Sequence, residues 1–343
     1  MLKVAINGFG RIGRTSFKIA LEKFSDQVEI VAINDLTDAK TLAHLLKYDS
    51  NYGIWDHNVS NDETNIIVDG EKYEVLAQKD PSLLPWKDLS VDVVIESTGR
   101  FTDKAGMSSH IKAGAKKVVL SAPAKPASPE GGQGGGGDVP TLVLGVNGDK
   151  YGGEEIINNA SCTTNCIAPV AEVINQKFGI AKAMMTTIHA YTADQNLQDG
   201  PHKDLRRARA AAANIVPTST GAAKATTETI PALKGLFDGV AIRVPVAVGS
   251  ISDFTFLLKK KVTVEEVNQA LEEASKTERL KGILAVTNEP IVSSDIVGRS
   301  ESAIVDLGLT QVVDGDMVKI FAWYDNEYGY SCRLVEQVVN IGK

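Results

Sequence analysis

Residues 2–13 read Leu2-Lys3-Val4-Ala5-Ile6-Asn7-Gly8-Phe9-Gly10-Arg11-Ile12-Gly13. The apolar residues before the first glycine predict a buried strand, and those after the last glycine have the periodicity of a helix. A second apolar run, residues 28–33, ends in Asn34-Asp35, which places Asp35 twenty-two positions after Gly13. A strand, a G-x-G-x-x-G turn, a helix, a second strand and an acidic residue, in that order, form a dinucleotide-binding fingerprint.

Each residue of this fingerprint has a physical role. Gly8 permits the tight turn, Gly10 lets the backbone approach a pyrophosphate, and Gly13 lets the helix pack closely on the strand. We expect the Asp35 carboxylate to accept hydrogen bonds from the ribose hydroxyls. NAD is therefore predicted over NADP, because a 2′-phosphate would be repelled by Asp35 and no arginine is close in sequence. The alternative, that Asp35 only caps the next helix, is weaker because Asp38 can do so.

The composition describes an ordinary globular protein. At 343 residues the chain is long enough for two domains, and 43% hydrophobic and 23% charged residues are typical of soluble proteins. Three cysteines without zinc-ligand spacing predict neither a disulfide framework nor a metal site, and favour the cytoplasm. We expect no signal peptide, since a strand pattern starts at once, and no membrane segment. A net charge of −7 disfavours nucleic-acid binding as a main function.

A second motif is Ser161-Cys162-Thr163-Thr164-Asn165-Cys166. An apolar run at residues 142–146 predicts a strand before it, and a helical pattern follows, so Cys162 is expected at a helix N-terminus. Unpaired backbone N–H groups and the helix dipole stabilise a thiolate there. Taken alone, Cys162 is better interpreted as a small buried hydrophobic residue, because most free cysteines are, and this is our interpretation of Cys166. His189, after the strand at residues 183–188, is a candidate base for the thiol.

The remaining pattern predicts an α/β protein with a Rossmann-type dinucleotide-binding domain and an α+β catalytic domain with a mainly antiparallel sheet. A glycine run at residues 130–138 predicts a flexible surface loop rather than a phosphate-binding loop. Thr263 and Glu266 have the spacing of a capping box. The predicted strands are residues 91–96, 117–120, 240–248, 251–258, 302–306 and 317–324, and the further helices are 105–113, 264–274 and 327–339.

Several motifs together resemble one family across nearly the whole chain. The segments that carry the resemblance are residues 5–14 and 161–166, His189-Ala190-Tyr191-Thr192, residues 217–223 and Trp323-Tyr324-Asp325-Asn326-Glu327. They are similar to phosphorylating glyceraldehyde-3-phosphate dehydrogenases, and residues 199–207 resemble the bacterial type. The cysteine motif is highly specific to that family.

The resemblance implies an activity and a set of site residues. Cys162 would be the nucleophile and His189 the base in the oxidation of D-glyceraldehyde 3-phosphate to 1,3-bisphosphoglycerate through a thioester, in glycolysis or gluconeogenesis. The substrate phosphate would bind Thr192 and Arg243, and inorganic phosphate Ser161, Thr163, Thr220 and Gly221. NAD would bind Asn7, Gly8, Gly10, Arg11, Ile12, Gly13, Asp35, Lys79, Thr98, Gly99, Ser121 and Asn326. The resemblance further implies a homotetramer, with residues 1–160 and 326–343 as the NAD-binding domain and 161–325 as the catalytic domain.

Two alternatives remain open at this stage. Erythrose-4-phosphate dehydrogenase shares these motifs but commonly releases the acid by hydrolysis. A non-catalytic moonlighting or RNA-binding homologue is disfavoured because the Cys162 and His189 pair is intact and the chain is acidic. A metal hydrolase is excluded by the lack of ligand clusters in the sequence.

Overall fold

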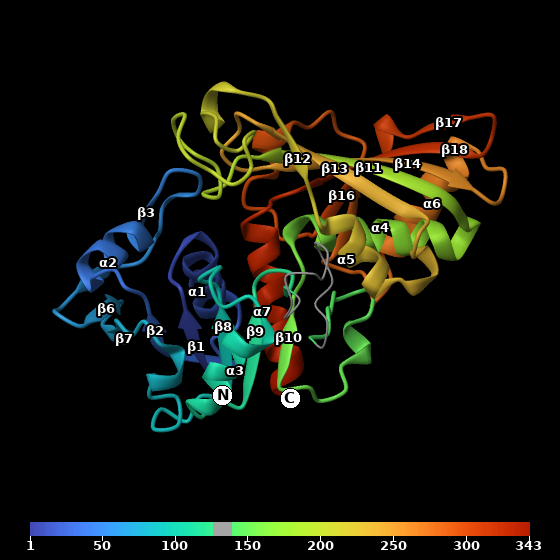
Figure 1. Cartoon of the computed structure of the whole chain (residues 1–343). Coiled ribbons are helices and arrows are strands. Elements are labelled where there is room, and N and C mark those ends of the chain that lie inside the picture. The colour runs from blue at the N-terminus through green and yellow to red at the C-terminus, as the bar shows by residue number, and fades with distance from the viewer. Residues whose placement is uncertain (126–138) are drawn as a thin grey trace. The chain divides into compact units, whose positions relative to one another are not determined.

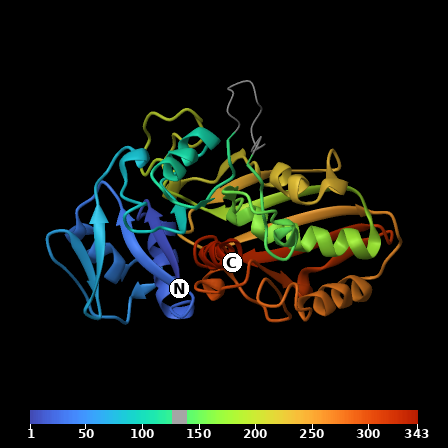
Figure 2. The same cartoon turned by 90° about the horizontal axis from the view of Figure 1, so that it is seen from below.

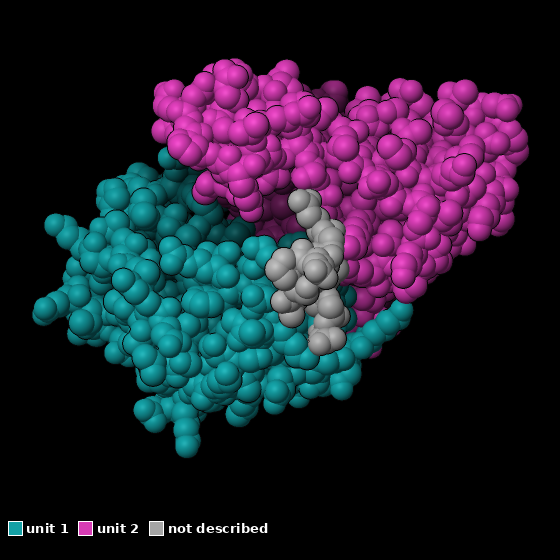
Figure 3. All heavy atoms as spheres, viewed as in Figure 1, with its two compact units in different colours: residues 1–142, 150–160, 331–343 teal, residues 143–149, 161–330 magenta. Residues whose placement is uncertain are grey.

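The computed structural model describes residues 1–125 and 139–343, so the glycine run predicted as a flexible loop lies outside the described residues. The chain divides into two compact units (Figure 3). Unit 1 contains residues 1–142, 150–160 and 331–343, and unit 2 contains residues 143–149 and 161–330. These units are defined by contacts between residues. The boundaries expected for the functional domains, which assign 326–330 and 143–149 differently, stay a prediction.

Unit 1 is built on one twisted sheet, with the strand order β10-β9-β8-β1-β2-β7-β6-β5. The five pairs from β10 to β7 are parallel, and β5, β6 and β7 are joined in antiparallel fashion. The strands are β1 Leu2–Asn7, β2 Val28–Asn34, β5 Val59–Asn61, β6 Asn65–Val68, β7 Glu71–Leu76, β8 Val93–Glu96, β9 Lys117–Leu120 and β10 Ile156–Asn158. The helices are α1 Arg11–Lys23, α2 Ala39–Lys47 and α3 Lys104–Lys112, and β3 Tyr48–Asp49 pairs with β4 Gly53–Ile54 (Figure 1). This is the predicted Rossmann-type architecture.

Unit 2 is an α+β unit with a second sheet, in the order β12-β13-β11-β14-β18-β16-β15, to which β17 adds beside β18. Only β11 with β13 and β15 with β16 pair in parallel, which confirms the mainly antiparallel prediction. The strands are β11 Ile180–Ala190, β12 Val216–Ser219, β13 Phe237–Val244, β14 Ser250–Leu258, β15 Leu284–Thr287, β16 Ala303–Asp306, β17 Gln311–Val313 and β18 Met317–Tyr324.

Three helices of unit 2 pack against this sheet, and Figures 1 and 2 show them on the same face. They are α4 Cys162–Phe178, α5 Ala222–Thr229 and α6 Val264–Ser275. The predicted capping box at the start of α6 is present, with Glu266 N donating to the Thr263 hydroxyl and Thr263 N to the Glu266 carboxylate. The last helix, α7, spans Tyr328–Gly342, and from Ser331 onward it belongs to unit 1.

The predicted strand at residues 142–146 is wrong. Only Thr141 forms a β-bridge there, to Asn158, and the chain then turns, with three successive N–H groups donating to the Val143 carbonyl. Gly145 has a φ of +78°, which strands do not allow, and a Cβ there would meet Leu280. The strand that precedes the cysteine motif is β10 instead. Strand β13 also ends at Val244, before Pro245, because proline has no N–H for the ladder.

Two glycines of the fingerprint are required by packing. Gly8 has a φ of +93°, and a Cβ on it would lie 2.6 Å from the Thr98 backbone nitrogen. A Cβ on Gly13 would lie 2.1 Å from the Gly8 carbonyl oxygen, so α1 can approach β1 only through a glycine. By contrast, a Cβ on Gly10 would meet no atom within 4 Å.

We therefore predict that Gly13→Ala and Gly10→Ala differ sharply in stability. Gly13→Ala should lower the free energy of unfolding by at least about 2 kcal/mol, because neither backbone can yield without separating α1 from β1. Gly10→Ala, at an open N-cap position, should cost less than about 1 kcal/mol. Urea unfolding followed by circular dichroism measures both. Equal losses in the two variants would contradict the packing role of Gly13.

Candidate active site

The thiol of Cys162 lies at the first residue of α4. Ser161 is the N-cap, and its hydroxyl oxygen accepts a hydrogen bond from Thr164 N at 3.0 Å. Ala160, just before it, has a φ of +55°, a left-handed conformation that costs a non-glycine residue energy and that recurs at functional sites. The predicted helix-start position of the cysteine is therefore confirmed. Cys166, one turn later, is fully buried against the Ala322 carbonyl.

His189, near the end of β11, faces this thiol, with 3.4 Å between Cys162 Sγ and His189 Nε2. The other ring nitrogen, Nδ1, lies 2.6 Å from the Ala190 carbonyl oxygen. A carbonyl oxygen can only accept, so this shorter contact puts the hydrogen on Nδ1, and in the neutral ring Nε2 keeps its lone pair. Arg243 Nη1 also lies 3.0 Å from Nδ1, and in this tautomer it donates to the Ala190 carbonyl instead. His189 thus has the tautomer of a base directed at the thiol.

Burial dominates the electrostatics of this pair. It raises the pKa of the Cys162 thiol, while the Arg243 guanidinium and hydrogen bonds from Thr163 act in the lowering direction. Burial, followed by the Arg243 charge, lowers the pKa of His189 to about 3. The direction for the thiol is opposite to the one expected from the helix N-terminus alone. Both shifts favour a neutral thiol beside a neutral imidazole, so the proton passes to Nε2 when the sulfur attacks.

Arg243 reaches the same place from the neighbouring strand, since β11 and β13 pair in parallel with His189 opposite Arg243. Its Nη1 donates to the Ala190 carbonyl at 3.0 Å and lies 3.4 Å from the Thr192 hydroxyl. Its Nε is buried without a hydrogen-bond partner, and burial lowers the pKa of the guanidinium. Within residues 1–125 and 139–343, no carboxylate forms an ion pair with Arg243. A partly buried cation with donors to spare is a site for an anion.

Sequence reasoning missed Tyr324 and Arg207. The Tyr324 hydroxyl lies 2.9 Å from the Thr163 hydroxyl and 2.8 Å from that of Thr187, and its ring packs edge-on against His189. Burial raises the pKa of this phenol. Arg207 donates to the Thr218 hydroxyl at 3.0 Å and to the Ser219 carbonyl at 3.3 Å. Both carried a signal, since Tyr324 lies within one of the family motifs and Arg207 ends the segment 199–207 that resembles the bacterial type.

The other predicted residues of unit 2 are placed as follows. The Thr220 hydroxyl accepts from Ala222 N, and Gly221 is the N-cap of α5 without a side chain to cover the helix end. Asn326 Oδ1 accepts hydrogen bonds from Gly249 N at 3.0 Å and from the Ser250 hydroxyl at 2.9 Å. The Ser250 hydroxyl in turn accepts from Ala190 N, which ties Asn326 to the strand end that carries His189.

Unit 1 contains a cavity of about 360 Å³ at the carboxyl ends of its parallel strands. Of the predicted cofactor residues, Asn7, Gly8, Gly10, Asp35, Lys79 and Thr98 line it, and Arg11, Ile12, Gly13, Gly99 and Ser121 do not. The lining residues that sequence reasoning missed are Asn34, Leu36, Gln78, Ser97, Arg100 and Phe101. From the sequence we expected no arginine close to Asp35. The structure corrects this, because Arg100 lines the same cavity as Asp35.

The cavity fits a dinucleotide on its own geometry. The first turn of α1 has no acidic residue and no side-chain cap, so its N–H groups can face an anion. The open space at Gly10 lets an anion approach them. The Asp35 carboxylate accepts from Phe9 N at 2.8 Å and from Thr37 N at 3.0 Å, which fixes it at the end of β2. Arg11 instead pairs with Asp49 at 2.5 Å and lies over the Tyr52 ring.

The part of the chain that the structure describes holds no cluster of potential metal ligands. In that same part, every helix is too short or too polar to cross a membrane.

Comparison with known proteins finds one family for both parts of the chain. Residues 2–104 match the family described as glyceraldehyde 3-phosphate dehydrogenase, NAD binding domain, and residues 161–326 match its C-terminal domain. Glyceraldehyde-3-phosphate dehydrogenase of Borreliella burgdorferi is 54% identical over 342 residues, covering 98% of each chain. That of Streptomyces coelicolor is 54% identical over 343 residues, covering 99% of this chain and 98% of the relative.

A third relative, glyceraldehyde-3-phosphate dehydrogenase of Mycobacterium tuberculosis, is 55% identical over 349 residues and covers 100% of this chain and 99% of its own. The fingerprint, the cavity and the match of residues 2–104 together identify the cofactor as NAD. With both domains matched and full-length relatives above half identity, the chain belongs to the glyceraldehyde 3-phosphate dehydrogenase family.

Proposed function

We propose that this chain catalyses the NAD-dependent oxidative phosphorylation of D-glyceraldehyde 3-phosphate to 1,3-bisphosphoglycerate, as a step of glycolysis and gluconeogenesis in the cytoplasm. The observation that carries the proposal is the approach of Cys162 Sγ to the lone pair of His189 Nε2 at 3.4 Å, beside the Arg243 cation. The names of the relatives supply the substrate. Function follows the predicted domain division, with residues 1–160 and 326–343 binding NAD and 161–325 holding the chemistry.

The chain's own residues provide each proton transfer. Cys162 Sγ attacks the aldehyde carbon while its proton goes to His189 Nε2, and Nε2 then passes this proton to the aldehyde oxygen. The product is a hemithioacetal whose oxygen is stabilised by the Cys162 N–H and by His189. His189 then takes the hydroxyl proton while hydride leaves the carbon. Bound NAD supplies the acceptor for that hydride. An oxygen of inorganic phosphate attacks the resulting thioester, the carbon–sulfur bond breaks, and the acyl phosphate leaves the Cys162 thiolate.

Two anion positions follow from the donors around the thiol. Arg243 and Thr192 supply a cation and a hydroxyl for the substrate phosphate, and Arg243 has a buried Nε without a partner. Inorganic phosphate is assigned to Ser161, Thr163, Thr220 and the N-terminus of α5 at Gly221, which offers N–H groups. The Thr163 hydroxyl is held by Tyr324, so it can contribute only in that fixed orientation.

NAD is assigned to the cavity of unit 1 through the α1 N-terminus and Asp35. The residues that would hold it are Asn7, Gly8, Gly10, Arg11, Ile12, Gly13, Asp35, Lys79, Thr98, Gly99 and Ser121. The oxygen of Asn326 is committed to Gly249 and Ser250, so its amide nitrogen is the group that would donate to the nicotinamide carboxamide.

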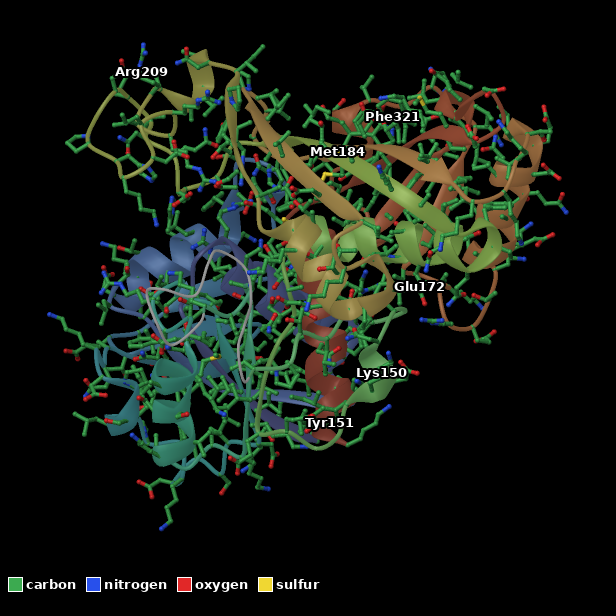
Figure 4. The ribbon with its side chains drawn as sticks, turned by 45° about the vertical axis from the view of Figure 1, so that its right-hand side comes forward. Lys150, Tyr151, Glu172, Met184, Arg209 and Phe321 are labelled. Carbon is green, nitrogen blue, oxygen red and sulfur yellow. The ribbon has the colours of Figure 1, made fainter. Side chains whose placement is uncertain are left out.

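We also propose a homotetramer. Figures 1 and 4 show the face of the unit 2 sheet opposite α4, on which Met184 and Phe321 lie, whereas Glu172 lies on α4. Met184, Val240 and Met317 are 64%, 50% and 49% exposed, which is unusual for apolar side chains of central strands. A sheet face with exposed apolar side chains among its polar ones is a surface that a second subunit would cover.

The activity test is NADH formation at an absorbance of about 340 nm from glyceraldehyde 3-phosphate, NAD and inorganic phosphate. We expect a dependence on phosphate and the loss of at least about 10³-fold in kcat for Cys162→Ser, because a serine hydroxyl is a much weaker nucleophile than a thiol beside the same base. Cys166→Ser is the matched control and should retain most activity, since its thiol is buried. A higher kcat/KM with erythrose 4-phosphate, independent of phosphate, would assign the chain to the other dehydrogenase.

Thiol labelling tests whether Cys162 is activated by His189 or is an unreactive cysteine. Iodoacetamide should modify Cys162 before the two buried cysteines, and His189→Asn should slow this reaction at neutral pH because the base is removed. Equal labelling of all three cysteines would contradict the assignment of the nucleophile.

Cofactor preference tests Asp35. We expect kcat/KM to favour NAD over NADP by roughly two orders of magnitude, because the carboxylate pairs with ribose hydroxyls and repels a 2′-phosphate. Asp35→Gly should narrow this ratio, since Lys79 and Arg100 of the same cavity then meet the phosphate without an opposing charge. An unchanged ratio in the variant, or comparable wild-type values, would refute the role of Asp35.

The lowered pKa of His189 makes folding depend on pH. Burial lowers this pKa to about 3 in the folded state, against 6.5 for an unperturbed imidazole. Below that ordinary value the unfolded chain therefore binds a proton that the folded chain does not, and stability is lost as the pH falls. Between about pH 6 and 4 the wild type should lose up to about 1.4 kcal/mol per pH unit more than His189→Asn, measured by urea unfolding. A difference that does not change with pH would contradict this, and His44→Asn, at an exposed histidine, is the control.

A further inference from the structure

A row of buried polar side chains runs from the wall of the unit 1 cavity, at Asn7 and Asn34, to residues beneath it. Apart from Asn7, the proposed function gives these residues no role. Trp86, Glu96 and His110 are fully buried, and Asn7 and Asn34 are 1% and 4% exposed. They come from separate parts of unit 1: the ends of β1, β2 and β8, the last turn of α3, and the segment before β8. Burying so many polar groups is costly unless each one is hydrogen-bonded.

The direction of every hydrogen bond in this row is fixed. An indole N–H can only donate, so Trp86 Nε1 donates to His110 Nδ1 at 2.9 Å. The hydrogen of the neutral His110 ring must then be on Nε2, which donates to Glu96 Oε2 at 3.0 Å. Asn7 Nδ2 donates to the same oxygen at 2.5 Å, and its Oδ1 accepts from Asn34 Nδ2 at 2.7 Å.

Both ends of the row reach the wall of the cavity. The second oxygen of Glu96 accepts from Thr98 N at 2.9 Å and from the Thr98 hydroxyl at 2.5 Å. Asn34 forms a pair of hydrogen bonds with the backbone of Gln78, at 2.9 Å each. Thr98 and Gln78 line the cavity, as does Phe101, whose ring packs edge-on against His110.

We propose that Glu96, oriented by His110 and Trp86, is a positioning residue for NAD. Its carboxylate receives donors from Asn7, His110 and Thr98, and so fixes the turn after β8 against Gly8, where a Cβ would already collide with Thr98 N. Glu96 is buried beneath the floor and acts through Thr98 and Asn7 instead of touching the cofactor. The inference rests on the proposed assignment of this cavity to NAD.

The chemistry of a carboxylate is what this position requires. Two oxygens with lone pairs on each can accept from the Thr98 pair of donors and from the Asn7 and His110 pair at once. An amide has one accepting oxygen, so Glu96→Gln would set its NH₂ against one of the two pairs. His110→Leu removes the donor to Glu96, whereas His110→Gln keeps an N–H that can reach it.

The experiment measures ADP-ribose binding by calorimetry, together with KM values for NAD and for glyceraldehyde 3-phosphate. We expect Glu96→Gln and His110→Leu to weaken ADP-ribose binding about tenfold and to raise the KM for NAD in proportion. The KM for glyceraldehyde 3-phosphate and the rate of Cys162 labelling should not change. His110→Gln should restore binding to within about threefold of the parent.

Met107→Ala is the control, since Met107 is a fully buried core residue on the same helix α3 that makes no hydrogen bond in the row. It should lower the melting temperature as much as His110→Leu does and leave ADP-ribose binding unchanged. Equal loss of binding in the two variants would overturn the proposal, as would normal binding in Glu96→Gln. If Glu96→Gln does not fold, Trp86→Phe, which removes one hydrogen bond and little volume, replaces it under the same criteria.

The parent protein and Asp35→Gly distinguish failure of this inference from failure of the proposed site. If the parent does not bind ADP-ribose, or if Asp35→Gly does not weaken its binding, the assignment of the cavity to NAD is wrong. The positioning role of Glu96 is then overturned as well. If Asp35→Gly weakens binding and the Glu96 and His110 variants do not, only the positioning role is overturned.

Discussion

The backbone of Ala190, through its carbonyl and its N–H, organises the catalytic half of the molecule. Its carbonyl oxygen accepts from His189 Nδ1 at 2.6 Å and from Arg243 Nη1 at 3.0 Å. Its N–H donates to the Ser250 hydroxyl, which donates in turn to Asn326. The backbone of one residue at the end of β11 thus positions three groups. They are the base His189, the cation Arg243 and the amide of Asn326, which we assign to the nicotinamide. Strand pairing holds that unit, because β11 is hydrogen-bonded to β13 on one side and to β14 on the other. A side chain could rotate away from its partners, but a central strand cannot, and this is why the geometry can be rigid.

Burial then sets the chemistry that this geometry allows. Removing water raises the pKa of the Cys162 thiol and lowers that of His189, and the Arg243 charge opposes the first shift while adding to the second. The ion pair that would make the sulfur a strong nucleophile is therefore the disfavoured state of the pair. At 3.4 Å the proton needs only one short transfer between Sγ and Nε2, so the thiolate can form as the substrate is attacked. The helix N-terminus contributes to that thiolate, yet it does not outweigh burial, which sequence position alone could not show.

The features of the fold and of the candidate site that could be predicted are those encoded in a short stretch of sequence. The fingerprint at residues 5–14, the cysteine at a helix start and the capping box at Thr263 are short patterns with a direct physical meaning, and each is present in the structure. The contact between Cys162 and His189 depends on how α4 packs against the sheet, and no sequence pattern reports it. Arg100 was overlooked because distance along the chain is a poor measure of distance across a sheet edge. The strand predicted at residues 142–146 was wrong because a short apolar run indicates burial but not backbone conformation. Its hydrophobic residues are largely buried, but Gly145 makes the chain turn.

The two buried histidines show what determines a role when the residue type does not. His189 meets a carbonyl, which can only accept, so its hydrogen lies on Nδ1 and its Nε2 is left to accept a proton from Cys162. His110 meets an indole, which can only donate, so its hydrogen lies on Nε2 and is given to Glu96. One neighbour makes a base and the other makes a structural donor, although both rings are neutral and buried. The tautomer of each ring therefore follows from what its neighbour at Nδ1 can do, Ala190 O of the next residue in one unit and Trp86 Nε1 of the segment before β8 in the other. Substituting Trp86 would remove the donor to His110 Nδ1 and leave the Glu96 carboxylate alone to set the tautomer. The carbonyl that directs His189 belongs to the backbone and cannot be removed by any substitution.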